Sequence, residues 1–255
     1  MSFFTDFIQD INVIYHLIKP IQGTNHQERL ESFYQGQAQT YDTFRKRLLQ
    51  GREEIYQSLI QYPGDIWLDL GGGTGANLDS IDENLSKFQK LYIVDLCPSL
   101  LAIAQHRIIA NGWSNVETVE ADVTQFTLPE QVVDIVTFSY SLTMIPDWFA
   151  AIDNAYRLLK PGGMIGVVDF YISRKYPVEQ WSSHSWLSRH FWPAWFGKDN
   201  VFLSSEHVPY LHYRFESVRF IERMANLPFL PGVKVPYYLF IGRKNHNNSS
   251  DILSR

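Results

Sequence analysis

Glycines and aspartates are the residues of this sequence whose types and spacing could do chemistry. Asp69 is followed by the run Gly71-Gly72-Gly73-Thr74-Gly75. Glycine has no Cβ, so it can adopt a positive φ and lets a bulky ligand approach the backbone. Because a short apolar segment, 66–70, precedes these glycines, we expect a buried strand that opens into a tight turn facing a ligand.

Two further acids follow apolar segments in the same way. Asp95 ends residues 90–95, and Asp122 follows residues 116–121. In an open parallel sheet, ligands bind outside the carboxyl ends of the strands. Asp95 also lies 24 residues after Gly71, at the end of the second expected strand, where a carboxylate can accept hydrogen bonds from a ribose diol. The pattern therefore predicts a ligand that carries an adenosine-like ribose.

The glycines fit two cofactors. Gly71-x-Gly73-x-x-Ala76 matches the dinucleotide fingerprint, whereas Asp69-x-Gly71-x-Gly73-x-Gly75 matches the pattern for S-adenosylmethionine (AdoMet). The glycines alone do not decide between them. Asp69 favours AdoMet, because an acid just before the turn suits a cationic amino-acid ligand and repels a pyrophosphate. Asp122 suits the adenine amino group.

The segments that must position these residues alternate between strand and helix patterns, which indicates βαβ units and a parallel sheet. Residues 214–223 and 233–243 are expected to form a terminal hairpin. The expected strands are 66–70, 90–95, 116–121, 132–138 and 164–170, and the expected helices are 76–85, 98–111 and 147–159.

Together with the turn at 158–163, these features resemble class I AdoMet-dependent methyltransferases over roughly residues 30–243. The resemblance implies a Rossmann-like α/β fold, with a mostly parallel seven-stranded sheet, an antiparallel edge hairpin and helices on both faces. We expect an N-terminal amphipathic helix at 1–25, a methyltransferase domain at 26–243, and a disordered polar tail at 244–255.

The same resemblance assigns AdoMet-binding residues. The glycine turn would lie under the methionine portion, Asp95 would hold the ribose, and Asp122 would meet the adenine. Asp122 and Ser139 could instead be simple turn residues. Residues 26–62, which precede the glycine turn, could fold over it. The expected set is Tyr34, Tyr41, Arg45, Asp69, Gly71, Gly72, Gly73, Thr74, Gly75, Asp95, Leu96, Leu100, Asp122, Val123, Ser139, Tyr140 and Ser141.

Four short segments look like the methyltransferase part of betaine-lipid synthases, which trimethylate the amine of a diacylglyceryl-homoserine lipid. They are residues 34–45, 190–196, 203–211 and 235–238. The resemblance implies an N-methyltransferase of lipid biosynthesis that acts on a polar-lipid amine to give a betaine lipid.

Such an enzyme would need aromatic faces for a quaternary ammonium product and a group that takes the amine proton. The aromatic candidates are Tyr140, Trp181, Trp186, Trp192, Trp195 and Tyr210. The catalytic candidates are Tyr140, His184, Glu206 and His207. Core packing is the alternative for each Trp, and the pair Glu206-His207 could simply belong to a helix start.

The composition limits which binding partners and which cell compartment we expect. A net charge of −5 over 255 residues provides no overall basic surface for nucleic acid. Methyl transfer needs no metal, and no metal-ligand cluster is evident. We expect a small-molecule or lipid methyl acceptor. The single Cys97 fits a reducing compartment, and no apolar run is long enough to span a bilayer, so we expect a cytoplasmic protein, soluble or peripheral to the membrane.

Residues 2–19 form one amphipathic helical face. This face could pack on the domain, or it could contact a membrane or cover an apolar substrate. It lacks the Lys/Arg-rich polar side that is typical of membrane-surface helices.

Three other functions stay open at this point. A C- or O-methyltransferase of an isoprenoid quinone or another apolar small molecule is the alternative within the class. An NAD-dependent oxidoreductase is the alternative from another class, against which Asp69 and the turn at 160–163 argue. A non-catalytic AdoMet-fold module is the third, and the intact glycine turn with its three strand-end acids argues against it.

Overall fold

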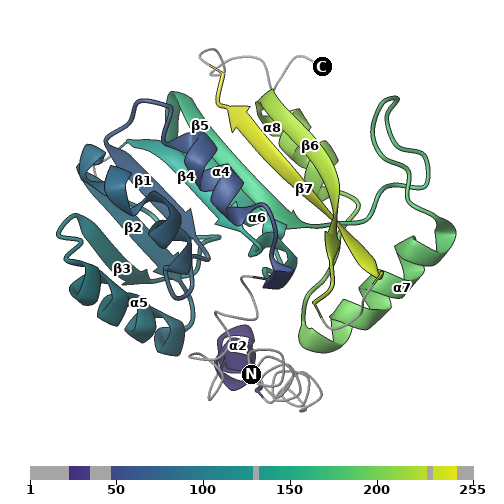
Figure 1. Ribbon diagram of the computed structural model, residues 1–255, viewed down its shortest axis with the longest axis horizontal. Helices are drawn as coiled ribbons and strands as arrows, with labels where there is room; N and C mark the ends of the chain where they lie inside the picture. Colours follow the sequence, from purple (N-terminus) through teal and green to yellow (C-terminus); the bar gives the residue numbers. More distant parts are fainter. Residues whose placement is uncertain (1–22, 35–46, 129–131, 229–231, 246–255) are drawn as a thin grey trace.

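A computed structural model of the chain describes residues 23–34, 47–128, 132–228 and 232–245 (Figure 1). One sheet organises these residues. Its strands are β1 (Ile66–Leu70), β2 (Lys90–Asp95), β3 (Val116–Glu120), β4 (Val133–Ser139), β5 (Leu159–Phe170), β6 (Glu216–Asn226) and β7 (Lys234–Arg243).

The seven strands lie in the order β3-β2-β1-β4-β5-β7-β6. Neighbouring strands from β3 to β5 are parallel, whereas β7 is antiparallel to both β5 and β6. The expected mostly parallel sheet with an antiparallel edge hairpin is therefore confirmed. Because the parallel strands end at one edge, the residues that follow β1, β2, β3 and β4 meet there.

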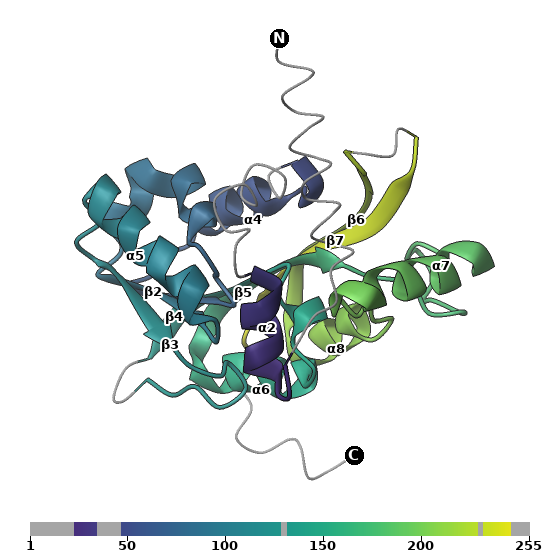
Figure 2. The ribbon, with the colours of Figure 1, turned by 90° about the horizontal axis from the view of Figure 1, so that it is seen from below.

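Helices cover both faces of the sheet (Figure 2). On one face, α4, η1 and α5 share a core with Trp67, and on the other, α6 and α8 share a core with Leu68 and Leu70. The helices are α2 (His26–Tyr34), α4 (Arg52–Leu59), α5 (Pro98–Asn111), α6 (Trp148–Leu158), α7 (Trp186–Phe196) and α8 (His207–Arg214), with the 3-10 helices η1 (Ala76–Lys87), η2 (Leu142–Met144) and η3 (Gly197–Asp199).

Two elements differ from expectation. The helix expected over residues 76–85 is a 3-10 helix that is interrupted at Ile81, whose φ of −126° is not helical. The fifth strand begins at Leu159 rather than 164, so it includes the expected turn. The backbone of that turn is paired: Gly162 N donates to Lys244 O (2.8 Å), and Lys244 N donates to Gly163 O (2.9 Å).

The expected amphipathic helix at 1–25, with its face over residues 2–19, and most of the tail at 244–255 lie outside the described residues. Within the described ranges, no helix is both long and apolar enough to cross a membrane. No group of three or more His, Cys, Asp or Glu side chains in those ranges is arranged to hold a metal ion.

Candidate functional site

The glycine turn after β1 requires glycine at more than one position. Gly71, Gly73 and Gly75 have φ values of 72°, 56° and 70°, a region that other L-residues rarely adopt. A Cβ on Gly71 would also lie 2.5 Å from the Cβ of Ser141, which follows β4. The turn is thus wedged between neighbouring strand ends, and Gly71 N donates to Val94 O of β2 (2.7 Å).

Asp95, the last residue of β2, supports this turn directly. Its Oδ2 accepts a hydrogen bond from Gly73 N, and its Oδ1 accepts one from Cys97 N, both at 2.9 Å. The side chain is almost fully buried but reaches a cavity. The backbone therefore holds the carboxylate at the cavity wall. Its role as the ribose ligand stays a prediction.

A cavity of about 360 Å³ opens at the strand ends. Two sets of residues line it. The predicted cofactor residues along it are Gly71, Gly73, Asp95, Leu96, Leu100, Asp122, Val123, Tyr140 and Ser141. The remaining lining residues, which the sequence reasoning missed, are Leu30, Ala121, Thr124, Gln125, Met144, Ile145, Pro146 and Asp147.

The missed residues had a usable signal. Residues 144–147 come two residues after Ser139-Tyr140-Ser141, so the segment after β4 returns to the same wall. Leu30 comes from α2, which lies before the glycine turn in sequence, as expected of a segment that folds over it. Helix α2 is tethered there, because Glu31 Oε2 accepts a hydrogen bond from the Cys97 thiol (3.1 Å).

Asp69 does not line the cavity, which corrects the expectation that it faces a ligand. Its side chain lies on the same face of β1 as Trp67, since alternate strand residues share a face. There Oδ1 accepts hydrogen bonds from Tyr56 Oη (2.5 Å) and Thr137 Oγ1 (2.8 Å). Burial raises the pKa of Asp69 to about 6. Asp69 therefore lies against the turn, where a Cβ on Gly72 would meet Oδ2 at 2.8 Å.

Several other predicted cofactor residues also lie off the cavity. Thr74 is buried, and its carbonyl accepts from Arg107 Nε (3.1 Å). Gly75 starts η1, and Ser139 is buried with its hydroxyl unpaired. The cavity wall is formed instead by Gly71, Gly73 and the residues after Ser139. Tyr41, Arg45 and the side chain of Tyr34 lie outside the described part of the chain.

Asp122 is both a turn residue and a cavity residue. Its Oδ1 accepts hydrogen bonds from Thr124 N (2.9 Å) and Thr124 Oγ1 (2.7 Å), which fixes the turn after β3. The side chain is exposed and lines the cavity beside Val123. The two interpretations of Asp122 are therefore compatible.

Tyr140 is held firmly in the cavity wall. It has a positive φ of 55°, its ring lies 4.6 Å from that of Phe170, and its hydroxyl donates to Gln50 O (2.7 Å). Burial raises the pKa of Tyr140 well above its usual range, so the hydroxyl stays protonated near neutral pH. A protonated hydroxyl that is already donating cannot act as a general base, so the geometry favours a positioning role.

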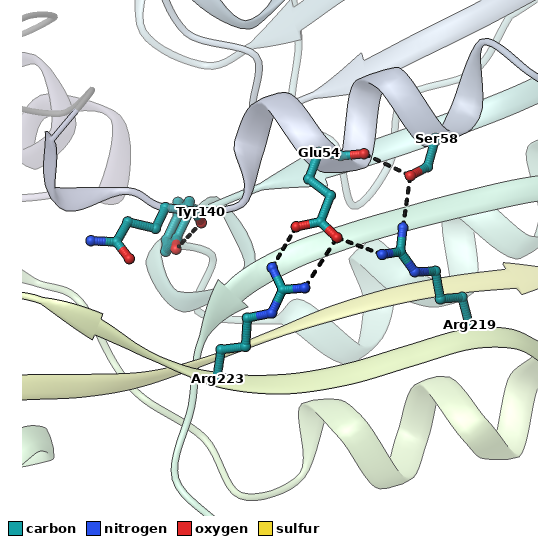
Figure 3. A network of polar contacts seen from close by, with 6 residues as sticks. Glu54, Ser58, Tyr140, Arg219 and Arg223 are labelled. Atoms are coloured by element: carbon teal, nitrogen blue, oxygen red, sulfur yellow. Dashed lines mark hydrogen bonds and ion pairs between the residues drawn. The ribbon is translucent and has the colours of Figure 1, made fainter.

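Tyr140 lies near the start of α4, and Glu54 of that helix belongs to a charged network (Figure 3). Gln50 comes just before α4, and α4 is tied to β6 through Glu54. Glu54 Oε1 pairs with Arg219 Nη2, and Glu54 Oε2 pairs with Arg223 Nη1, both at 2.5 Å. The edge hairpin thus anchors the helix whose start holds the Tyr140 hydroxyl.

The other three predicted catalytic residues do not reach the cavity. His184 Nδ1 accepts from Ser173 N (2.9 Å), and Glu206 forms an ion pair with Arg174. His207 is fully buried in the first turn of α8. The chain after β5 leads these residues away to the region around α8 and β6, so a spacing rule based on strand ends could not locate them.

The predicted aromatic candidates are also dispersed. Trp181 packs against His212 and Phe220, and Tyr210 packs against Trp148 and Phe149. Trp192 is in the core, whereas Trp186 and Trp195 are exposed. Among the described residues, Tyr140 is the only aromatic side chain that lines the cavity. The expected aromatic cage for a quaternary ammonium group is therefore not assembled from them.

His207 is expected to make stability depend on pH. Neither ring nitrogen has a hydrogen-bond partner, and burial lowers the pKa of His207 to about 3, against 6.5 for an exposed histidine. The unfolded chain therefore binds a proton below pH 6.5 before the folded chain does. Stability from this group is fully present above pH 6.5 and is lost as the pH falls toward 3, by about 1.4 kcal/mol per pH unit.

His207→Phe keeps an aromatic ring against Trp148, whose ring lies 4.6 Å away, but cannot be protonated. Between pH 7.5 and pH 5.5 we expect the variant to gain roughly 1.4 kcal/mol relative to the wild type. Asp69 and Asp169, whose pKa values burial raises to about 6 and about 7, act in the opposite direction but are common to both proteins. Urea unfolding at both pH values measures this, and a pH-independent difference would contradict it.

Comparisons with known proteins find similar methyltransferases. A model of the ubiE/COQ5 methyltransferase family matches residues 24–219. The ubiquinone/menaquinone biosynthesis C-methyltransferase UbiE of Hydrogenovibrio crunogenus is 30% identical over 109 residues, which cover 42% of this chain and 43% of that protein. UbiE of Brucella anthropi is 27% identical over 180 residues, 66% of this chain and 68% of that protein.

A solved structure supports the fold. Phosphoethanolamine N-methyltransferase 2 of Haemonchus contortus, in complex with phosphomonomethylethanolamine and S-adenosylhomocysteine, superposes with a TM-score of 0.65 at 13% identity. The match covers 88% of this chain and 61% of that one. At this identity the likeness concerns the fold alone.

Proposed function

Because this chain belongs to the ubiE/COQ5 methyltransferase family, we propose that it transfers the methyl group of AdoMet to a ring carbon of an apolar, quinol-type acceptor. This is the alternative within the methyltransferase class that the sequence left open. The chain aligns with 43% of the length of the first UbiE relative above.

The cavity carries the proposal, because its lining combines polar groups with apolar side chains. The lining includes the glycine turn and Asp95, where the backbone can approach a ligand and a carboxylate can accept hydrogen bonds from a ribose. Leu30, Met144, Ile145 and Pro146 contribute to an apolar wall. Small-molecule sites commonly have this composition, a mainly apolar cleft with a few placed polar groups.

The residues of the chain have separable roles in this proposal. When bound, AdoMet supplies an electrophilic methyl group. Asp95 holds the ribose and thereby fixes the position of the cofactor, while the apolar wall orients the acceptor ring and excludes water. Methylation at carbon releases a proton from the acceptor. Asp147, an exposed carboxylate that lines the cavity, is the candidate to receive it.

The other functions receive less support. Methylation of a lipid amine would leave a quaternary ammonium group, for which the described part of the cavity offers one aromatic ring, that of Tyr140. An NAD-dependent oxidoreductase is set aside, since the family to which the chain belongs is one of methyltransferases. The intact turn and the held Asp95 also argue against a non-catalytic module.

The experiment is an acceptor panel with isotopically labelled AdoMet and the purified full chain. It contains a polyprenyl naphthoquinol with a free ring carbon, the same quinol already methylated there, a diacylglyceryl-homoserine lipid and a phosphatidylethanolamine. We expect label only in the first, with fragmentation placing the methyl group on carbon. Label confined to the homoserine lipid would instead establish the betaine-lipid reaction, and label on oxygen would establish an O-methyltransferase.

Tyr140→Phe separates positioning from base catalysis. The substitution removes the hydrogen bond to Gln50 O but leaves the ring against Phe170. One such bond is worth about 1 kcal/mol, so we expect kcat to fall by less than about tenfold. Steady-state kinetics with the accepted quinol measures this. A fall of roughly a thousandfold would mean that the hydroxyl takes part in proton transfer.

A further inference from the structure

Helix α7 carries apolar side chains on two opposite sides. On its inner side, Trp192 and Phe196 are buried in the core. On its outer side, the side chains that remain accessible follow two adjacent rows of i, i+4 spacing, so they form one continuous face. This outer face consists of Trp186, Leu187, His190, Phe191, Ala194 and Trp195.

The outer face is unusually apolar for an exposed helix. Trp186 is 67% exposed, Leu187 65%, Phe191 41% and Trp195 40%. The rings of Phe191 and Trp195 lie 5.6 Å apart, so the apolar surface is continuous between them. Isolated exposed apolar residues are normal, but a contiguous patch of this kind marks a surface for interaction.

The segment around this face is basic on balance. Residues 174–199 contain Arg174, Lys175, Arg189 and Lys198 against Glu179 and Asp199, although the chain as a whole has a net charge of −5. Tryptophan is the residue that best suits the boundary between lipid headgroups and acyl chains. Lysine and arginine beside such residues are attracted to anionic headgroups. The charge and the side-chain types therefore complement an anionic lipid surface.

The position of α7 relates this face to the cavity. Helix α7 lies toward the same edge of the sheet as α2, the edge where the parallel strands end (Figure 1). Its inner side also reaches the cavity wall through ring contacts. Phe196 lies 5.2 Å from Phe170, and Phe170 lies 4.6 Å from Tyr140, which lines the cavity.

We propose that the outer face of α7 docks the protein on an anionic lipid surface, with Trp186 and Trp195 in the headgroup region and Lys198 toward the phosphates. Docking in this orientation leaves the inner side of α7 packed on Phe170 and keeps the cavity close to the bilayer. The surface is distinct from residues 2–19, and it does not depend on which acceptor the enzyme methylates.

The test is flotation of the full chain with vesicles, which reads binding rather than activity. One vesicle is phosphatidylcholine alone, and the other also contains phosphatidylglycerol. We expect binding to the anionic vesicle that weakens as salt is added. The variant Trp186→Ser/Phe191→Ser/Trp195→Ser should bind at least about tenfold more weakly, because it removes most of the apolar area available for insertion. Lys198→Glu should weaken binding to the anionic vesicle by about fivefold.

The matched control is Ile109→Ser/Tyr213→Ser, which removes two exposed apolar side chains from α5 and α8, at 68% and 75% exposure. It should bind as the wild type does. Circular dichroism confirms that each variant is folded. The proposal is overturned if wild type and triple variant bind equally, or if the triple variant instead converts a dimer to a monomer in sedimentation. It is also overturned if Phe4→Ser/Phe7→Ser/Ile8→Ser alone abolishes vesicle binding.

Discussion

Replacing Gly71 with alanine is expected to lower AdoMet affinity by about 100-fold. The residue has a φ of 72°, which costs a non-glycine residue about 1–2 kcal/mol. The added Cβ would also lie 2.5 Å from Ser141 Cβ, so the turn or the segment after β4 must shift. Either shift displaces a cavity wall. The strain of the positive φ lowers the stability of the free and the bound protein alike, whereas the displaced wall weakens AdoMet binding. A 100-fold loss of affinity corresponds to about 2.7 kcal/mol.

Gly112→Ala is the matched control for this change. Gly112 has nearly the same φ, 67°, but a Cβ there meets nothing within 4 Å, and it lies at the end of α5 away from the cavity. We expect Gly112→Ala to lower the free energy of unfolding by about 1 kcal/mol and to leave AdoMet affinity unchanged. Titration calorimetry with AdoMet measures both variants. Equal affinities would show that the close approach of Gly71 to Ser141 does not shape the cofactor site.

Replacing Asp95 with asparagine is expected to cost between about 10-fold and 100-fold in AdoMet affinity. The two carboxylate oxygens accept from Gly73 N and Cys97 N, and an amide nitrogen in place of either oxygen would face another donor. A hydrogen bond to a charged group contributes about 1.5–3 kcal/mol, and the ribose loses its charged acceptor as well.

Asp122→Asn is the comparison variant, for which we expect a smaller loss of AdoMet affinity. Asp122 is exposed and already engaged by Thr124, so its substitution should weaken AdoMet by much less than Asp95→Asn does. Isothermal titration of the two variants against the wild type, with S-adenosylhomocysteine as a second ligand, tests the order. If Asp122→Asn were the more damaging of the two, the proposed division between ribose and adenine contacts would be wrong.

The sequence was most informative where local preferences for helix ends and turns combined with the geometry of a parallel sheet. Pro98 and Gly112 delimit α5 as expected from helix-end preferences. Gly71, Asp95 and Asp122 were brought together because they end successive strands of a parallel sheet, whose carboxyl ends meet at one edge. Because that arrangement depends on strand order alone, it can be predicted without knowing any side-chain contact.

Residues beyond β5 were placed by packing and could not be located in this way. His207 has the chemistry of a base, but it lies on the inner side of α8, packed against Trp148 with no polar partner. Trp186 and Trp192 are six residues apart on α7, yet one faces solvent and the other the core. Their roles follow from which side of the helix meets the sheet.

Asp69 shows most clearly which properties the sequence determines and which depend on the tertiary structure. By itself the sequence determined that an acid precedes a glycine turn at the end of a buried strand, because apolar patterning and glycine chemistry are local properties. Only the tertiary structure decided that this acid faces Tyr56 and Thr137 instead of the cavity. The reason is that strand residues alternate between faces, and the helix covering each face is chosen by the packing of the whole domain.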